Sequence, residues 1–173
     1  MWGSIPEWVT AIAAVLALAA AVWAGITSRR LVDVESGRDE VAARRRAREQ
    51  ARQVSAWCVV CPDAPLPVGL LVQNSSTAPV FQMTVESTDA QGQHRPPLHL
   101  TIVPPGDYVV TADEQFHWTF PEDARTQGHV RPVTKKDTWM VQSLTFVDSS
   151  GVRWHRDQHG TLSESTDQSS DAS

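Results

Sequence analysis

The sequence has few of the residues that usually build reactive or covalently bridged sites. It contains 2 cysteines and 1 tyrosine in 173 residues. A secreted domain held together by disulfides would carry more cysteine, which argues against that class. No glycine-rich phosphate loop of the Walker or Rossmann type occurs, and no serine stands in the G-x-S-x-G pattern of hydrolases. We therefore expect a protein that is not an enzyme and needs no cofactor.

Positive charge is scarce in the second part of the chain. The whole sequence has a net charge of -5. Between Arg29 and Trp57 there are eight arginines and five acidic residues, whereas from Cys58 onward there are seven basic and fourteen acidic residues. An acidic distal domain repels a phosphate backbone, so we expect no nucleic-acid partner.

Charge is absent from the segment Trp8 to Ser28, which reads WVTAIAAVLALAAAVWAGITS. A helix of this length would reach roughly 31 Å, close to the bilayer hydrocarbon core of about 30 Å. A cleaved signal peptide and a buried core helix are the alternatives, but residues 1–7 lack the basic start of a signal peptide. We predict a short N-terminal segment over 1–7 and a transmembrane helix over 8–28 that acts as a single-pass signal anchor in a lipid bilayer.

Basic residues follow this apolar segment, and none precedes it. The positive-inside rule therefore predicts an N-terminus outside the cell, with the C-terminal domain in the cytoplasm at the plasma membrane. The same arginines could contact anionic lipid head groups. They are Arg29, Arg30, Arg44, Arg45, Arg46 and Arg48.

Two further features concern the helical part of the chain. Ala13, Ala17, Ala21 and Gly25 form a row of small residues at four-residue spacing, which would allow weak homo-oligomerisation through close helix packing. Residues 29–56 are rich in alanine and charge and predict a juxtamembrane helix. A spacer helix is the main interpretation and a weak dimeric coiled coil is the alternative, because clean heptads are absent.

After Trp57 the sequence changes to short β-forming runs separated by turn residues. Since no long helical pattern alternates with them, we expect residues 57–162 to form an antiparallel immunoglobulin-like β-sandwich. The polar tail 163–173 should be disordered. The expected strands are 67–73, 80–87, 98–103, 108–111, 116–120, 139–147 and 152–156. The expected core residues are Trp57, Val72, Val85, Ile102, Trp139, Leu144, Phe146 and Trp154.

This layout resembles a family of small single-pass membrane proteins of unknown function that are frequent in actinobacteria. The resemblance covers most of the chain and implies an architecture, namely an anchor, an Arg/Ala-rich helix and a β-sandwich-like domain. It implies no catalytic residues. The matching pieces are the apolar segment, the helix ending in Val54-Ser55-Ala56-Trp57 and the strand end Val72-Gln73-Asn74-Ser75-Ser76. The last part of the domain also matches, at Phe146-Val147-Asp148, Gly151, Trp154, Arg156, Gly160 and Leu162.

Cys58 and Cys61 form the one C-x-x-C pair. Two thiols supply half of a zinc site, and no second pair exists, so buried structural cysteines are the simpler interpretation. His155, Asp157 and His159 alternate and would share one face of a strand, in reach of a single ion, although an exposed polar edge is the simpler interpretation. We therefore expect a non-enzymatic protein-interaction or scaffolding module with an unknown protein partner. The alternative is a metal- or redox-linked sensor that uses Cys58 and Cys61. Phe116, Trp118 and Phe120 are either a contact patch or core residues.

Overall fold

The structure, a computed structural model, describes residues 12, 15–18, 23 and 42–165. The chain divides into two units, Met1–Arg45 and Arg46–Ser173. In the first unit residues 12, 15–18 and 23 are helical. Their large apolar side chains are exposed, from Ile12 at 51% to Trp23 at 77%. The rest of the predicted transmembrane helix 8–28, and residues 29–41 of the predicted juxtamembrane helix, lie outside the described residues. Within the part that is described, no helix has the length and apolar character needed to cross a membrane.

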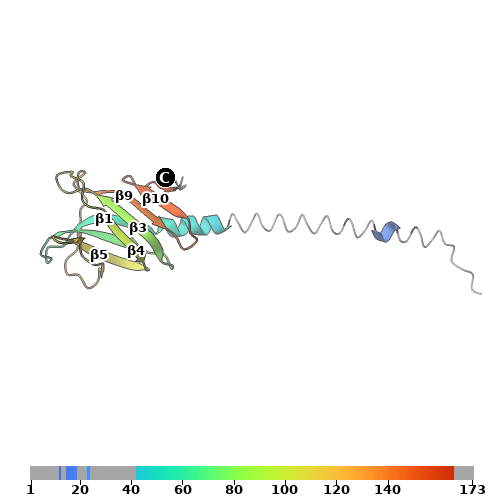
Figure 1. Ribbon diagram of the computed structural model, residues 1–173, viewed down its shortest axis with the longest axis horizontal. Coiled ribbons are helices and arrows are strands. Elements are labelled where there is room, and N and C mark those ends of the chain that lie inside the picture. The colour runs from blue at the N-terminus through green and yellow to red at the C-terminus, as the bar shows by residue number, and fades with distance from the viewer. Residues whose placement is uncertain (1–11, 13–14, 19–22, 24–41, 166–173) are drawn as a thin grey trace, which may run out of the picture. The chain divides into compact units, whose positions relative to one another are not determined.

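The second unit contains two antiparallel β-sheets, which lie against each other in Figure 1. The prediction of a mainly β protein with two antiparallel sheets is therefore confirmed. One sheet has the strand order β6-β5-β2-β1-β8, with β7 also paired to β5, and the other has the order β11-β10-β9-β3-β4. The strands are β1 (Val54–Val60), β2 (Val68–Asn74), β3 (Val80–Ser87), β4 (Leu98–Val103), β5 (Gly106–Asp113), β6 (His117–Trp118), β7 (Glu122–Asp123), β8 (Arg131–Pro132), β9 (Val141–Val147), β10 (Arg153–Asp157) and β11 (Leu162–Glu164).

The main hydrophobic core lies between the two sheets. Val72, Val85, Leu144, Phe146 and Trp154 are buried in it, as expected from the sequence. Trp57 and Trp139 are only partly buried. Ile102 was expected in the core but is 52% exposed. The reason is that the alternation of inward and outward side chains along β4 is interrupted at its end, where Val103 rather than Ile102 is buried.

Three loops share the local sequence Asp-x-x-Gly and the same geometry. In each loop the aspartate Oδ1 accepts hydrogen bonds of 2.8–2.9 Å from the backbone N–H groups two and four residues later. The glycine has a φ of 80–84°, which side chains with a Cβ rarely adopt. A three-residue hairpin loop requires this left-handed residue. The loops are 89–92, 148–151 and 157–160, and the latter two connect β9 to β10 and β10 to β11.

The helix before the sandwich ends sooner than the sequence suggested. Its described part ends at residue 52, and β1 begins at Val54, so the last part of the predicted helix 29–56 is strand. The β-branched residues of Val54–Val60 favour a strand that pairs with β2 along its whole length. Ala47 and Ala51 are buried in the main core. At the other end, β11 extends to Glu164, because Ser163 and Glu164 pair with β10, so the expected disorder from residue 163 does not begin there.

Candidate functional site

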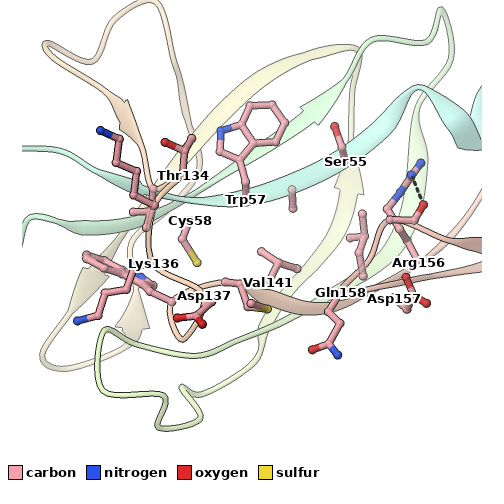
Figure 2. Close-up of a pocket in the computed structure, with 17 residues that line it drawn as sticks. Ser55, Trp57, Cys58, Thr134, Lys136, Asp137, Val141, Arg156, Asp157 and Gln158 are labelled. Atoms are coloured by element: carbon pink, nitrogen blue, oxygen red, sulfur yellow. Dashed lines mark hydrogen bonds between the residues drawn. The ribbon is translucent and has the colours of Figure 1, made fainter.

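A groove of about 770 Å³ lies between β1 of one sheet and the ends of β9 and β10 in the other. Figure 2 shows Cys58 and Val141 in the middle of the groove, Lys136 on one side and Arg156 on the other. The groove is lined by Ser55, Ala56, Trp57, Cys58, Val133, Thr134, Lys135, Lys136, Asp137, Trp139, Met140, Val141, Leu144, Arg156, Asp157, Gln158 and Gly160.

The first half of β1 forms an open sheet edge along this groove. On the side away from β2, β1 pairs with β8 only at Val59 and Val60. One more bond follows, from the N–H of Val133 to the carbonyl of Cys58 at 2.9 Å. Backbone groups of alternate residues in a strand point to the same side, so the N–H and carbonyl of Ala56 point to this edge as well. The edge from Val54 to Trp57 has no strand partner among the described residues.

The other outer strands of the described sheets are protected against edge pairing, whereas this one is not. β6, β7, β8 and β11 have two or three residues each, and β8 contains Pro132. β4 is enclosed by the proline pairs 96–97 and 104–105. Short edges and prolines are the usual means of preventing strand addition. The free edge of β1 carries neither a charge nor a proline. Val54 is fully buried, so the outward backbone groups of Ala56 are the ones that an added strand could reach.

The walls of the groove differ in chemistry. The side chains of Cys58 and Leu144 belong to the buried core and give the groove an apolar floor. Lys135 and Lys136 are exposed on the segment that follows β8. From Cys58 onward three of the seven basic residues line the groove, but only two of the fourteen acidic residues do. The groove is therefore a basic region on an acidic domain.

Arg156 connects the groove to the helix before β1. Its terminal nitrogens donate to the carbonyls of Gly160 at 3.0 Å, Ala51 at 3.2 Å and Arg52 at 3.4 Å. The last two carbonyls are at the end of the helix, where a cation is favourable. Burial lowers the pKa of the Arg156 guanidinium. No carboxylate of the described residues forms an ion pair with it.

Two buried donors in the groove wall have no hydrogen-bond partner in the described part of the protein. They are Nε of Arg156 and Nε1 of Trp139. Buried polar groups are almost always paired, and an unpaired donor costs about 1–3 kcal/mol. Asp157 does not supply the missing acceptor through Oδ1, because that atom accepts from the N–H groups of His159 and Thr161. These two hydrogen bonds hold the pKa of Asp157 below its usual value, and the bond from Thr161 has the larger effect.

The structure does not bring Cys58 and Cys61 together. Cys58 is buried between the sheets, whereas Cys61 belongs to a separate cluster with Val59 and Val109. Burial raises the pKa of the Cys58 thiol to about 11, against a smaller opposite effect of Arg95. Burial, and then the charge of Asp63, also raise the pKa of Cys61. Both thiols therefore stay protonated near neutral pH and are poor nucleophiles and poor ligands.

The remaining candidate ligands do not gather either. His155 and Asp157 are in β10, while His159 lies in the loop after the strand has ended. Within residues 42–165 and the few described positions before them, no three His, Cys, Asp or Glu side chains could hold one metal ion. The metal hypothesis for Cys58 and Cys61 therefore has no geometric support.

The residues predicted to act at the membrane are only partly described. The side chains of Arg44, Arg45, Arg46 and Arg48 are exposed on the helix 42–52. Arg29 and Arg30 lie outside the described residues. Of the small-residue row, Ala17 is described and exposed, whereas Ala13, Ala21 and Gly25 lie outside the described residues.

A second hollow, of about 740 Å³, lies near β6. Of the three aromatic candidates there, Phe116 is 70% and Phe120 91% exposed, whereas Trp118 is buried. The indole of Trp118 donates to the carbonyl of Pro96 at 2.8 Å, and the guanidinium of Arg95 lies 5.0 Å from its ring. The aromatic set is therefore divided between a surface pair and a core residue, and nothing in the structure shows what would cover the surface pair.

Sequence reasoning missed the groove and its rim. Lys135 and Lys136 were a possible signal, because two adjacent lysines are unusual in a domain with twice as many acidic as basic residues. Comparisons of the chain with protein-family models, with curated proteins and with solved structures found no match.

Proposed function

We propose that this protein is a non-enzymatic interaction module tethered to the membrane, and that it binds an extended segment of another protein in the groove beside β1. The observation that carries the proposal is the free edge from Ser55 to Trp57, which borders an open groove. An exposed edge recognises an extended peptide through main-chain hydrogen bonds, and neighbouring pockets select its side chains. An edge of three residues is about 10 Å long, enough for a short added strand.

The order of the strands supports the finer assignment to an immunoglobulin-like sandwich. β1, β2 and β5 are neighbours in one sheet, and β10, β9, β3 and β4 follow one another in the second. The chain passes between the sheets after β2 and after β4, as in Greek-key sandwiches. Proteins with such folds share a core but carry different functions on their loops and sheet edges, which agrees with a binding role here.

The membrane tether is supported by the apolar segment itself. Its described residues are helical, and their large apolar side chains are exposed. Apolar side chains on every side of a helix need an apolar surrounding, which a bilayer supplies. The arginines after it favour a domain at the cytoplasmic face of the plasma membrane. Carbonate extraction of membranes should leave the full-length protein in the pellet, and a reporter fused to the C-terminus should be active in the cytoplasm.

The binding function is tested by selecting peptides from a displayed random library on the full-length protein in detergent micelles. We expect binders that protect the amide of Ala56 from hydrogen exchange. The variant Ala56→Pro removes the outward N–H, and proline is compatible with an edge strand. It should abolish binding while far-UV circular dichroism is unchanged.

If the Ala56→Pro variant does not fold, the selected peptides can be changed instead. N-methyl groups on alternate backbone nitrogens of a peptide remove its N–H donors and should likewise abolish binding. A library that yields no binders, or binders indifferent to both changes, would contradict the proposed function.

A further inference from the structure

We infer that the segment bound in this groove is an extended strand that carries both apolar and acidic residues. This inference rests on the proposed function and adds the chemistry of the partner. It follows from the two kinds of residue that line the groove beside β1, namely a buried apolar floor and a basic rim. Apolar side chains of the segment would meet Cys58 and Leu144 on the floor, and acidic side chains would meet the basic rim. Arg156 of the rim lies directly opposite Leu144 in the β9–β10 pair, so both side chains are on the same face.

The rim favours carboxylates over other polar groups. Lys135, Lys136 and Arg156 line the groove together with Asp137 and Asp157, a local excess of positive charge on a domain that is otherwise acidic. Complementary charge directs association and excludes partners of the wrong sign. A basic or neutral segment would gain nothing from this rim, whereas an acidic segment would be attracted to it and repelled by the rest of the domain.

Arg156 gives the most specific reason for an acidic partner. Its charge is partly buried, and its three hydrogen bonds go to neutral carbonyls rather than to a carboxylate. A partly buried charge is costly unless an opposite charge compensates it. The unpaired Nε of Arg156 and Nε1 of Trp139 are two further donors among the residues that line the groove, and neither has an acceptor in the described part of the protein. A carboxylate placed at this end of the groove would compensate the charge and supply acceptor atoms.

The experiment uses the peptides selected on the full-length protein in detergent micelles. We expect the selected sequences to be enriched in Asp and Glu and to contain apolar residues as well. For such a peptide, Lys136→Glu should weaken binding by about tenfold or more at low salt, and added salt should weaken the binding of the unchanged protein. The matched control is Arg125→Glu, which makes the same charge change on an exposed side chain outside the groove. It should leave the affinity within about twofold.

The outcomes separate this inference from the function on which it rests. Selected peptides without an acidic excess, or with equal affinity for the Lys136→Glu and Arg125→Glu variants, would overturn the acidic strand and leave edge binding intact. The absence of any selected peptide would overturn both.

Discussion

Asp148 provides a strict test of how the sandwich is stabilised. Its carboxylate is 1% exposed and accepts three hydrogen bonds. Oδ1 accepts from the N–H groups of Ser150 at 2.8 Å and Val152 at 2.9 Å, and Oδ2 accepts from the indole of Trp154 at 2.8 Å. The substitution Asp148→Ala would leave the buried indole N–H without an acceptor and would remove two partly buried loop bonds. An unsatisfied buried donor costs about 1–3 kcal/mol, and a hydrogen bond to a charged group contributes about 1.5–3 kcal/mol, so we expect a loss of about 4 kcal/mol in the free energy of unfolding.

The chain contains its own control for this substitution. Asp89 makes the same two loop bonds, to the N–H groups of Gln91 and Gln93, but is only partly buried and has no indole partner. Since water can replace its bonds, Asp89→Ala should cost about 1 kcal/mol. Asp148→Asn should be intermediate, because the amide keeps one acceptor oxygen but can place its NH₂ against the Trp154 indole.

Equilibrium urea unfolding of the full-length protein, followed by far-UV circular dichroism, measures all three variants. For a domain of this size, 4 kcal/mol corresponds to a decrease of roughly 15 °C in Tm. If Asp148→Ala and Asp89→Ala lost equal stability, the buried indole bond would contribute nothing and this explanation would be wrong.

Three further predictions concern other parts of the sandwich. Gly69→Ala should cost about 2 kcal/mol by urea unfolding, because a Cβ there would lie 2.8 Å from a backbone carbonyl of β5; a neutral result would show that the sheet adjusts. Trp118→Ala should cost about 3–5 kcal/mol, whereas Phe120→Ala, at a position 91% exposed, should change stability by less than about 0.5 kcal/mol; similar losses would contradict the assignment of one to the core and one to the surface. Because burial raises the pKa of Cys58 from 9.0 to about 11, its native thiol should resist iodoacetamide at about pH 8 and react after unfolding in urea; mass spectrometry showing rapid native alkylation would refute this.

The parts of the fold that were predicted correctly depend on short stretches of sequence. The hairpin of β9 and β10 is encoded by alternating strands and by the Asp-x-x-Gly loop 148–151, so neighbouring residues contain the information. Ile102 shows the limit of this reasoning. Its apolar side chain fits the pattern of a core strand, but the inward face changes at Val103, whose carbonyl accepts a 3.0 Å hydrogen bond from the buried amide of Asn74. That contact joins residues 29 positions apart and has no local signal.

The candidate site depended even more on distant contacts. Whether a strand is an edge is decided by which other strands pair with it, so the free half of β1 could not be read from Val54–Val60 alone. The disposition of Cys58 and Cys61, by contrast, follows from extended backbone geometry. Cys61 directly follows β1, and an odd separation along extended backbone places two side chains on opposite faces. Recognising that this segment is extended would have been enough to separate the two thiols.

The junction between helix and sandwich has a mechanical consequence. A single residue, Gln53, separates the end of the helix from β1, and its carbonyl accepts a bond from Ser75. The side chain of Gln50 accepts from the hydroxyl of Ser149 at 2.6 Å, and Arg156 holds the last turn. Residues 46–52 are thus connected to the sandwich by a stiff junction rather than by a flexible linker. Rotation of this helix would rotate β1 and the edge beside which the proposed partner strand would bind. A torque on the helix and the binding of that strand would therefore be coupled through Gln53.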